Sequence, residues 1–242
     1  MTYLLPHIFT TLNIFFGFYA ISKVIDGDFS KASWGIFLAI FFDIFDGRIA
    51  RFFKIQSRFG LEYDSLCDLV SFGIAPALLI YQFSLKSFNK IGWLASFLYA
   101  TCVALRLARF NIKNLLKKDY FEGLPSPAGA GILASSVLFL LKTKINPIYK
   151  NYGLLILTYL IAYLLISPIQ YPSFKEFKIK KSQAFYFLIF FILGLTVIAS
   201  NPSFYLFIIF GFYLFLGPLL FLKKIVQNFF KKTLSRKITF RS

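Results

Sequence analysis

Long apolar stretches recur along the whole chain, and each is about as long as a membrane-spanning helix. A helix needs about 20 mostly apolar residues to cross the hydrocarbon core of a bilayer. Turn-forming residues such as Asp26-Gly27-Asp28 and Asn201-Pro202 separate the stretches. We expect eight transmembrane helices, at residues 4–25, 32–53, 60–82, 91–110, 127–143, 153–170, 184–200 and 203–222. The pattern therefore predicts an all-α fold, a polytopic membrane bundle of about eight helices.

The composition agrees with a membrane protein. Charged residues make up 15% of the 242 residues, whereas about a quarter is typical of a soluble domain. This excludes an ordinary soluble domain. The formal net charge of +17 is then best explained by the membrane, because basic residues hold loops on the cytoplasmic side and attract anionic lipid. We expect membrane lipid as a partner and no nucleic acid.

The basic residues are distributed unevenly between the two sides of the predicted bundle. Most of the 27 Lys and Arg residues fall in the connections after the second, fourth and sixth helices and in the tail from Lys223 onward. Since positive residues favour the cytoplasm, we expect a multi-pass protein of the cell (inner) membrane with both termini in the cytoplasm. The opening residues, MTYLLPH, lack the basic start of a signal peptide, so we expect them to be retained.

Half of the ten acidic residues lie between positions 43 and 68, at Asp43, Asp46, Glu62, Asp64 and Asp68. Ionised carboxylates at membrane depth are costly unless they face a polar cavity, a cation or a partner, so they are candidates for function. Glu62 is expected to point elsewhere, as a solvated residue at a helix end. The alternative is structural, with the acids paired to nearby arginines that lock two helices together.

The spacing of these acids favours a shared site. Asp43 and Asp46 lie three residues apart on the second predicted helix, and Asp64 and Asp68 lie four apart on the third, so each pair occupies one helical face. Four converging carboxylates suit one or two hard divalent cations such as Mg²⁺ or Mn²⁺. The single histidine, His7, excludes a zinc site of Cys and His residues.

Small residues and an arginine share the faces that carry the acids. Gly47 and Ala50 would let a bulky phosphorylated ligand approach the second helix, and Arg51 can pair with a phosphate. Gly60 plays the same part on the third helix, one turn before Asp64. The combination indicates phosphoryl-group chemistry at a membrane surface, with a carboxylate to remove the proton of an incoming hydroxyl.

Residues 43–68 fit the pattern D-x2-D-G-x2-A-R-x8-G-x3-D-x3-D at every spacing. This pattern resembles the signature of the CDP-alcohol phosphotransferase family. The resemblance implies a polytopic helical enzyme that displaces CMP from a CDP-linked donor by the hydroxyl of an acceptor alcohol, with a pair of divalent ions. It further implies that Asp43, Asp46 and Asp64 are metal ligands, that Asp68 is the general base and also touches a metal, that Gly47, Ala50 and Gly60 line the nucleotide pocket, and that Arg51 contacts phosphate.

Two further stretches resemble the phosphatidylserine synthase branch of this family. Residues 5–18, LPHIFTTLNIFFGF, are similar to its amino-terminal P-N-x2-T-x2-N-x3-G pattern, with His7 in place of the usual Asn. LRLARFN at 105–111 and FEGLPSPAGA at 121–130 resemble its second signature. The resemblance implies CDP-diacylglycerol as donor, L-serine as acceptor, phosphatidylserine and CMP as products, and a homodimer.

These stretches add further candidate site residues. Thr10 and Asn13 are expected to bind near the nucleotide, or alternatively to join the first two helices inside the bilayer. Candidates for binding the acceptor or a phosphate are Arg106, Arg109, Asn111 and Ser126. Equally, the two arginines could extend to the membrane interface as positive residues on the cytoplasmic side.

The resemblance also suggests how the chain is divided. Residues 1–170 are expected to form a catalytic six-helix core, residues 171–222 two additional transmembrane helices, and residues 223–242 a basic cytoplasmic tail. Two alternatives to serine transfer stay open at this point. One is the same chemistry with another alcohol, such as glycerol 3-phosphate or inositol phosphate, and the other is an ion-coupled transporter, in which intramembrane acids mark an ion path.

Overall fold

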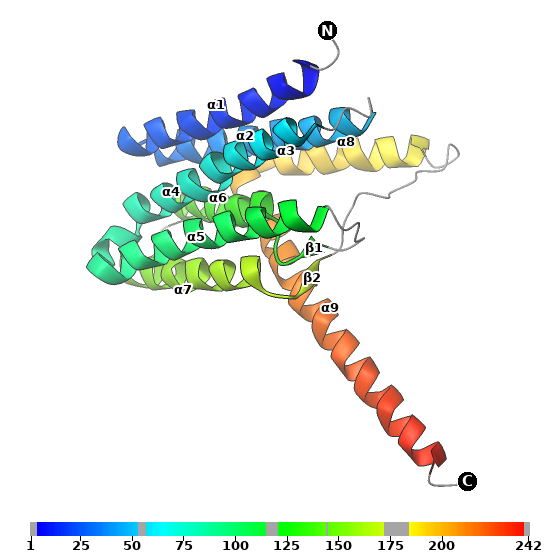
Figure 1. Ribbon diagram of the computed structural model, residues 1–242. Coiled ribbons are helices and arrows are strands. Elements are labelled where there is room, and N and C mark those ends of the chain that lie inside the picture. The colour runs from blue at the N-terminus through cyan, green and yellow to red at the C-terminus, as the bar shows by residue number, and fades with distance from the viewer. Residues whose placement is uncertain (1–3, 53–56, 115–120, 144, 172–183, 240–242) are drawn as a thin grey trace.

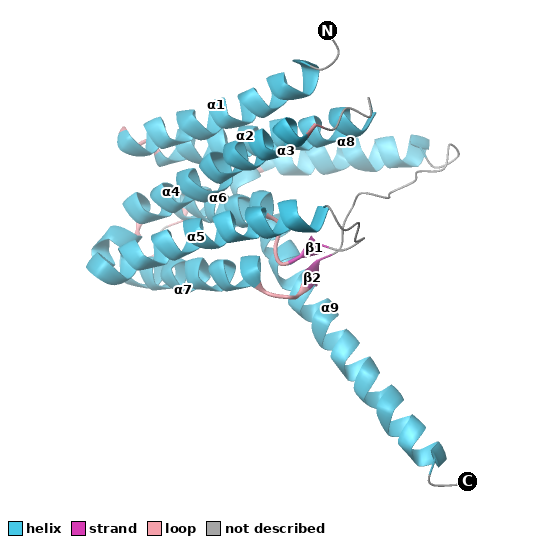
Figure 2. Cartoon of the chain, viewed as in Figure 1, coloured by secondary structure: helices cyan, strands magenta, loops and turns pink. Residues whose placement is uncertain are grey.

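The computed structural model describes residues 4–52, 57–114, 121–143, 145–171 and 184–239. Nearly all of these residues are helical, and two short strands complete the fold (Figure 2). The elements are α1 (Leu4–Ile25), α2 (Phe29–Phe52), α3 (Arg58–Asp68), η1 (Leu69–Ile74), α4 (Ala75–Phe83), η2 (Leu85–Phe88), α5 (Asn89–Asn114), β1 (Phe121–Glu122), α6 (Ser126–Lys142), α7 (Pro147–Ile166), β2 (Gln170–Tyr171), α8 (Ala184–Ser200) and α9 (Pro202–Thr239). The all-α membrane fold predicted from the sequence is confirmed.

The long helical segments follow the eight predicted ones in order, and the differences lie at their ends. The sixth predicted helix, 153–170, begins too late and ends too late, because α7 runs from Pro147 to Ile166. Proline is favoured in the first turn of a helix, where its missing N–H costs nothing, and the Asn146 side chain caps the helix by accepting from the N–H of Ile148 at 3.0 Å. The Asn-Pro pair therefore starts this helix instead of separating it from the turn before.

The third predicted helix, 60–82, is not uniform. An α-helix through Asp68 passes directly into a π-helical turn, Leu69–Ile74, and then into α4. π-helical turns inside α-helices occur frequently at functional sites. Here the turn follows immediately after Asp68 and lies against α1 and α5.

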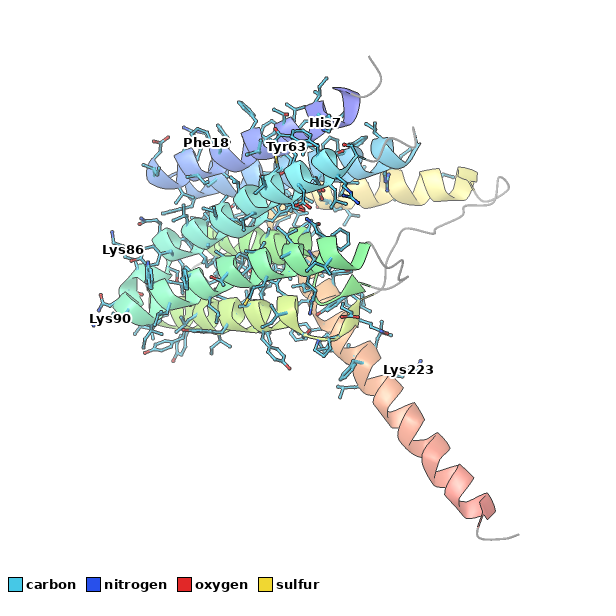
Figure 3. The ribbon with its side chains drawn as sticks, in the orientation of Figure 1. His7, Phe18, Tyr63, Lys86, Lys90 and Lys223 are labelled. Carbon is cyan, nitrogen blue, oxygen red and sulfur yellow. The ribbon has the colours of Figure 1, made fainter. Side chains whose placement is uncertain are left out.

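The helices run roughly alongside one another, so that the bundle has two ends (Figure 1). One end carries the N-terminus and the strands β1 and β2, which pair antiparallel with Phe121 opposite Tyr171. The other end carries the connections between α1 and α2 and between α4 and α5; in Figure 3, Lys86 and Lys90 lie there, far from His7 and Tyr63.

The last helix extends well beyond the bundle (Figure 1). α9 has 38 residues, so it is about 57 Å long at 1.5 Å per residue. Its first half packs against α6, whereas the apolar sequence ends near residue 222. The predicted membrane span 203–222 agrees with the apolar segment Pro202–Lys223, and the helix itself continues to Thr239 through the basic residues of the tail.

Five helical segments within the described ranges are long and apolar enough to cross a membrane: His7–Ile25, Arg58–Phe83, Leu85–Ile112, Pro147–Ile166 and Pro202–Lys223. Many large apolar side chains on these helices are exposed, among them Phe18, Trp93 and Phe212. The centre of the bundle is packed with fully buried residues such as Leu79 and Ile132. Apolar side chains both inside and outside are typical of a protein whose solvent is lipid, and the chain is an integral membrane protein.

Candidate active site

Three of the predicted acids meet inside the bundle. Asp43 on α2 and Asp64 and Asp68 on α3 each offer a carboxylate oxygen, and these oxygens lie within 4.8 Å of one another. Asp68 is buried and the other two are partly buried. The two helices converge through these side chains, while α1 packs against both of them.

The structural alternative for these acids finds no support in the described side chains. None of Asp43, Asp64 and Asp68 forms an ion pair with Arg48, Arg58 or any other described basic residue. Arg106 is within electrostatic reach of Asp43 and Asp68, but it does not pair with them. Carboxylates held this close repel one another unless a cation lies among them.

Asp46 lies beside this cluster, outside the group of three. It is buried, and its Oδ2 accepts a hydrogen bond from the hydroxyl of Thr10 on α1. It is within electrostatic reach of Asp43 and Asp64. Thr10, predicted to lie near the nucleotide, thus contacts an acid of the signature.

Asn13 connects α1 to the cluster itself. Its Nδ2 donates to Oδ1 of Asp68 at 2.9 Å, and the residue is fully buried. Its Oδ1 is buried without a hydrogen-bond partner among the described residues. An unpaired buried oxygen next to the carboxylates is a further oxygen that a cation or a ligand donor could satisfy.

Close contact between α1 and the π-helical turn fixes this arrangement. A Cβ placed on Gly17 would lie 2.2 Å from Ser71 Oγ and 2.8 Å from Ser71 Cα, so only glycine allows the two helices to meet here. The Ser71 hydroxyl donates to the carbonyl oxygen of Asn13 at 3.0 Å. Gly17, the last residue of the amino-terminal pattern, therefore positions Asn13 against Asp68.

Gly60 lies where α1 approaches α3. A Cβ at this position would lie 3.1 Å from His7 Cε1, and the His7 ring meets those of Phe59 and Tyr63 edge-on. The Gly60 N–H donates to the Ser57 side chain, which caps the start of α3. His7, the residue that departs from the branch pattern, thus packs at the same end of the bundle as the acids.

The second signature contributes a buried arginine. Arg106 on α5 is 7% exposed and donates from Nη1 to the Ser126 hydroxyl at 2.7 Å. Ser126 is fully buried at the start of α6. Arg106 Nε is buried and has no partner among the described residues. Since a buried guanidinium is costly without full hydrogen bonding, this N–H is available to an anionic ligand.

Arg109 has a different environment. Its guanidinium donates to three backbone carbonyl oxygens, those of Ile166 at 2.9 Å, Glu122 at 2.9 Å and Leu165 at 3.2 Å. It therefore ties the end of α7 to β1. Gly123, with a φ of +84°, lies against the same group, where a Cβ would be 2.9 Å from Arg109 Nη2.

Asn111 bonds to α3 through side chains other than the clustered acids. Its Nδ2 donates to Oε2 of Glu62 at 3.1 Å, and its Oδ1 accepts from the Ser65 hydroxyl at 3.1 Å. Glu62 is exposed, as expected, but it links α3 to α5 through this contact. Gly47 is exposed on α2. The side chains of Ala50 and Arg51 lie outside the described residues.

The residues present fit divalent cations. The donor set consists of carboxylate oxygens from two helices, which is what Mg²⁺ and Mn²⁺ prefer. A fourth oxygen donor, the Asn13 amide, lies next to these carboxylates. Asp43, Asp64 and Asp68 are the residues that could hold such an ion.

Sequence reasoning missed the residues that α9 and β2 bring toward this region. Tyr213 on α9 is within electrostatic reach of Arg106, and Tyr171 on β2 packs on Tyr213 with ring centroids 5.7 Å apart. No local pattern marks these tyrosines, because each acts through contacts with residues distant in the sequence.

The fold and the acid cluster define a class, that of polytopic helical membrane proteins with a cluster of carboxylates between helices. Comparison with known proteins gives the family. A family model described as CDP-alcohol phosphatidyltransferase matches residues 3–164. The chain belongs to the CDP-alcohol phosphatidyltransferase family, whose members are transferases that depend in general on divalent metals.

Two similar proteins share the same name. The chain is 35% identical over 236 residues to the CDP-diacylglycerol–serine O-phosphatidyltransferase of Helicobacter pylori, covering 96% of this chain and 97% of that protein. It is 37% identical over 172 residues to the protein of that name in Bacillus subtilis, covering 71% of this chain and 92% of the relative. The similarity to the Helicobacter pylori protein therefore extends through the C-terminal helices.

Proposed function

We propose that this protein transfers the phosphatidyl group of CDP-diacylglycerol to the hydroxyl of L-serine, giving phosphatidylserine and CMP. The observation that carries the proposal is the convergence of Asp43, Asp64 and Asp68 within 4.8 Å, at the positions of the family signature. Similarity to serine transferases over nearly their whole length supports serine as the acceptor.

The cluster is proposed to hold two divalent ions, Mg²⁺ or Mn²⁺, through Asp43, Asp64 and Asp68, with Asp46 as a further ligand. Such ions, when bound, supply positive charge that stabilises the negative charge on phosphoryl oxygens. The buried Thr10 hydroxyl and Asn13 amide orient Asp46 and Asp68 by the hydrogen bonds described above. The pocket for the nucleotide is proposed to include Gly47, Ala50, Arg51 and Gly60.

Asp68 is proposed as the general base. The serine hydroxyl gives its proton to the Asp68 carboxylate as its oxygen forms a bond to the phosphorus that carries the diacylglycerol. The bond from that phosphorus to the oxygen of CMP breaks, and CMP leaves. Arg106 is proposed to bind the serine carboxylate or a donor phosphate through its unpartnered Nε.

The acceptor is tested directly by supplying membranes that contain the protein with CDP-diacylglycerol and one labelled alcohol at a time. We expect label in phospholipid and release of CMP with L-serine alone. If label enters phospholipid from glycerol 3-phosphate or inositol phosphate instead, that alcohol is the acceptor in place of serine, and the proposed transfer chemistry stands. Ion uptake without CMP release would favour the transporter.

We also propose an orientation of the bundle in the membrane. The basic connections at the end of the bundle that carries the N-terminus support placing this end, and the opening of the site, in the cytoplasm of the cell (inner) membrane. The family resemblance supports a homodimer. In intact cells, an impermeant maleimide is expected to label a cysteine introduced at Lys86 but not one at Lys223, and the reverse labelling would contradict the orientation.

A further inference from the structure

The C-terminal helix α9 lies outside the residues that the family model matches, and a buried hydrogen bond joins it to β2. Pro218 lies inside α9 and has no N–H to donate to the carbonyl oxygen of Leu214, four residues earlier. The Tyr171 hydroxyl donates to that oxygen at 3.1 Å. Tyr171 is 1% exposed and Leu214 2%, so the contact is shielded from water and lipid.

The neighbouring glycine makes room for the tyrosine ring. A Cβ on Gly217 would lie 2.3 Å from Tyr171 Cζ, which no side chain could tolerate. The Gly217-Pro218 pair therefore does two things: proline leaves a backbone oxygen without its helical donor, and glycine admits the ring whose hydroxyl replaces that donor.

The same arrangement occurs a second time, next to the acids. Pro76 in α4 cannot donate to the carbonyl oxygen of Phe72, again four residues earlier, and the hydroxyl of Tyr99 donates to that oxygen at 2.8 Å. Tyr99 is fully buried. A buried tyrosine opposite a helical proline is thus a repeated structural device in this protein, used at the π-helical turn that follows Asp68 and again in α9.

Tyr171 is connected to the site along the backbone of the two strands. It lies opposite Phe121 in the β1–β2 pair. Beyond that pair, the N–H of Gly123 donates to the oxygen of Ile169 at 2.8 Å, and that of Leu124 to the oxygen of Leu164 at 2.9 Å. These bonds hold the chain that leads into α6, where Ser126 accepts from Arg106.

A second connection runs through α9 itself. The Tyr171 ring packs on Tyr213, and Tyr213 is within electrostatic reach of Arg106. Further along α9, Phe210 fills the space that Gly131 leaves on α6, where a Cβ would lie 2.3 Å from its ring. α9 therefore packs on α6, the helix that begins at Ser126, and brings Tyr213 near Arg106.

We propose that Tyr171 is a positioning residue: by donating to the Leu214 oxygen that Pro218 leaves without a helical donor, it holds α9 against the strands and keeps Arg106 and Ser126 in place for the acceptor. The kinetic part of this proposal rests on the proposed serine transfer. The structural part does not.

The test is a double-mutant cycle of Tyr171→Phe and Pro218→Ala in the purified full-length protein, with thermal unfolding and steady-state kinetics as readouts. Tyr171→Phe removes the hydroxyl and leaves the Leu214 oxygen buried and unpaired, so the thermal midpoint is expected to fall by about 3 °C. The KM for L-serine is expected to rise about fivefold with kcat within about twofold.

Pro218→Ala supplies the missing N–H at position 218. The double variant is therefore expected to regain the wild-type midpoint and KM, and Pro218→Ala alone to resemble the wild type. Tyr159→Phe is the matched control, since this exposed hydroxyl also meets a backbone oxygen, that of Ile91 at 3.4 Å, and no change in KM is expected.

Each outcome decides the proposal. A double variant as impaired as Tyr171→Phe overturns it, as does a Tyr171→Phe protein that matches the wild type. Rescue of the midpoint without any change in KM refutes the link to the acceptor. If Tyr171→Phe does not accumulate, recovery of folded protein by Pro218→Ala supports the proposal and failure to recover overturns it. Failure of the proposed function would appear separately, as a wild-type protein inactive with serine.

Discussion

The amide of Asn13 on α1 donates a 2.9 Å hydrogen bond to the carboxylate of Asp68, 55 residues later in the chain. The two residues belong to different sequence patterns, and the bond joins them into one buried unit. It leaves the second carboxylate oxygen of Asp68 available for a cation or a proton. Asn13 thus orients the residue proposed as the general base.

Replacing Asn13 by Ala should therefore lower kcat by about tenfold or more, because a hydrogen bond to a charged group contributes about 1.5–3 kcal/mol. Initial rates of CMP release from CDP-diacylglycerol with L-serine measure this. Thr11→Val is the control: Thr11 is exposed on the same helix, and its loss should change the rate less than about twofold. Equal rates for Asn13→Ala and the wild type would contradict the role of Asn13.

Neutralising any acid of the signature should nearly abolish turnover. The variants Asp43→Asn, Asp46→Asn, Asp64→Asn and Asp68→Asn keep the side-chain size but remove the charge that holds cations, and we expect losses of about a hundredfold or more in kcat. Glu62→Gln is the matched control on α3, since Glu62 is exposed and outside the cluster. Normal turnover in one Asp variant would remove that residue from the site.

The two pairs of acids could be predicted because the spacing within each pair is local, although Asp46 then lies outside the cluster of Asp43, Asp64 and Asp68. A spacing of three or four residues puts Asp43 with Asp46, and Asp64 with Asp68, on single helical faces whatever the surrounding fold. The family expectation, which rests on the same residues, is confirmed. Hydropathy likewise located the long helices, because the length of an apolar run reflects the thickness of the bilayer.

Contacts between distant segments could not be predicted in this way. Hydropathy shows which segments are apolar and long enough to cross the bilayer, but it does not show which backbone oxygens Arg109 reaches or that β1 and β2 pair. Hydropathy located the membrane span of α9, Pro202–Lys223, but not the end of the helix at Thr239, since a helix does not stop where its sequence becomes polar unless a residue breaks it. Pro218, an obvious candidate for a break, is accommodated by Tyr171.

Metal removal should abolish activity reversibly. EDTA is expected to stop CMP release, and added Mn²⁺ or Mg²⁺ to restore it, because the three clustered carboxylates repel one another without a cation. Binding should also raise the thermal midpoint of the wild-type protein. Asp64→Asn, which loses one ligand of the cluster, should show a smaller rise at the same ion concentration. Full activity in excess chelator would refute the metal site.

The contact between Gly17 and Ser71 should be intolerant of even one added methyl group. In Gly17→Ala, the new Cβ would lie 2.8 Å from the Ser71 Cα, a backbone atom, so α1 must shift away from the π-helical turn. We expect a loss of about 1–3 kcal/mol in the free energy of unfolding. We also expect reduced turnover, since the same shift draws Asn13 away from Asp68.

Gly153→Ala separates this effect from a general effect of alanine in a helix. A Cβ on Gly153 meets nothing within 4 Å, and alanine favours the helix over glycine by about 1 kcal/mol, so this variant should be as stable as the wild type or slightly more so. Thermal unfolding in detergent and CMP release measure both variants. If Gly17→Ala kept wild-type stability and turnover, close packing of α1 on the π-helical turn would not be what positions Asn13.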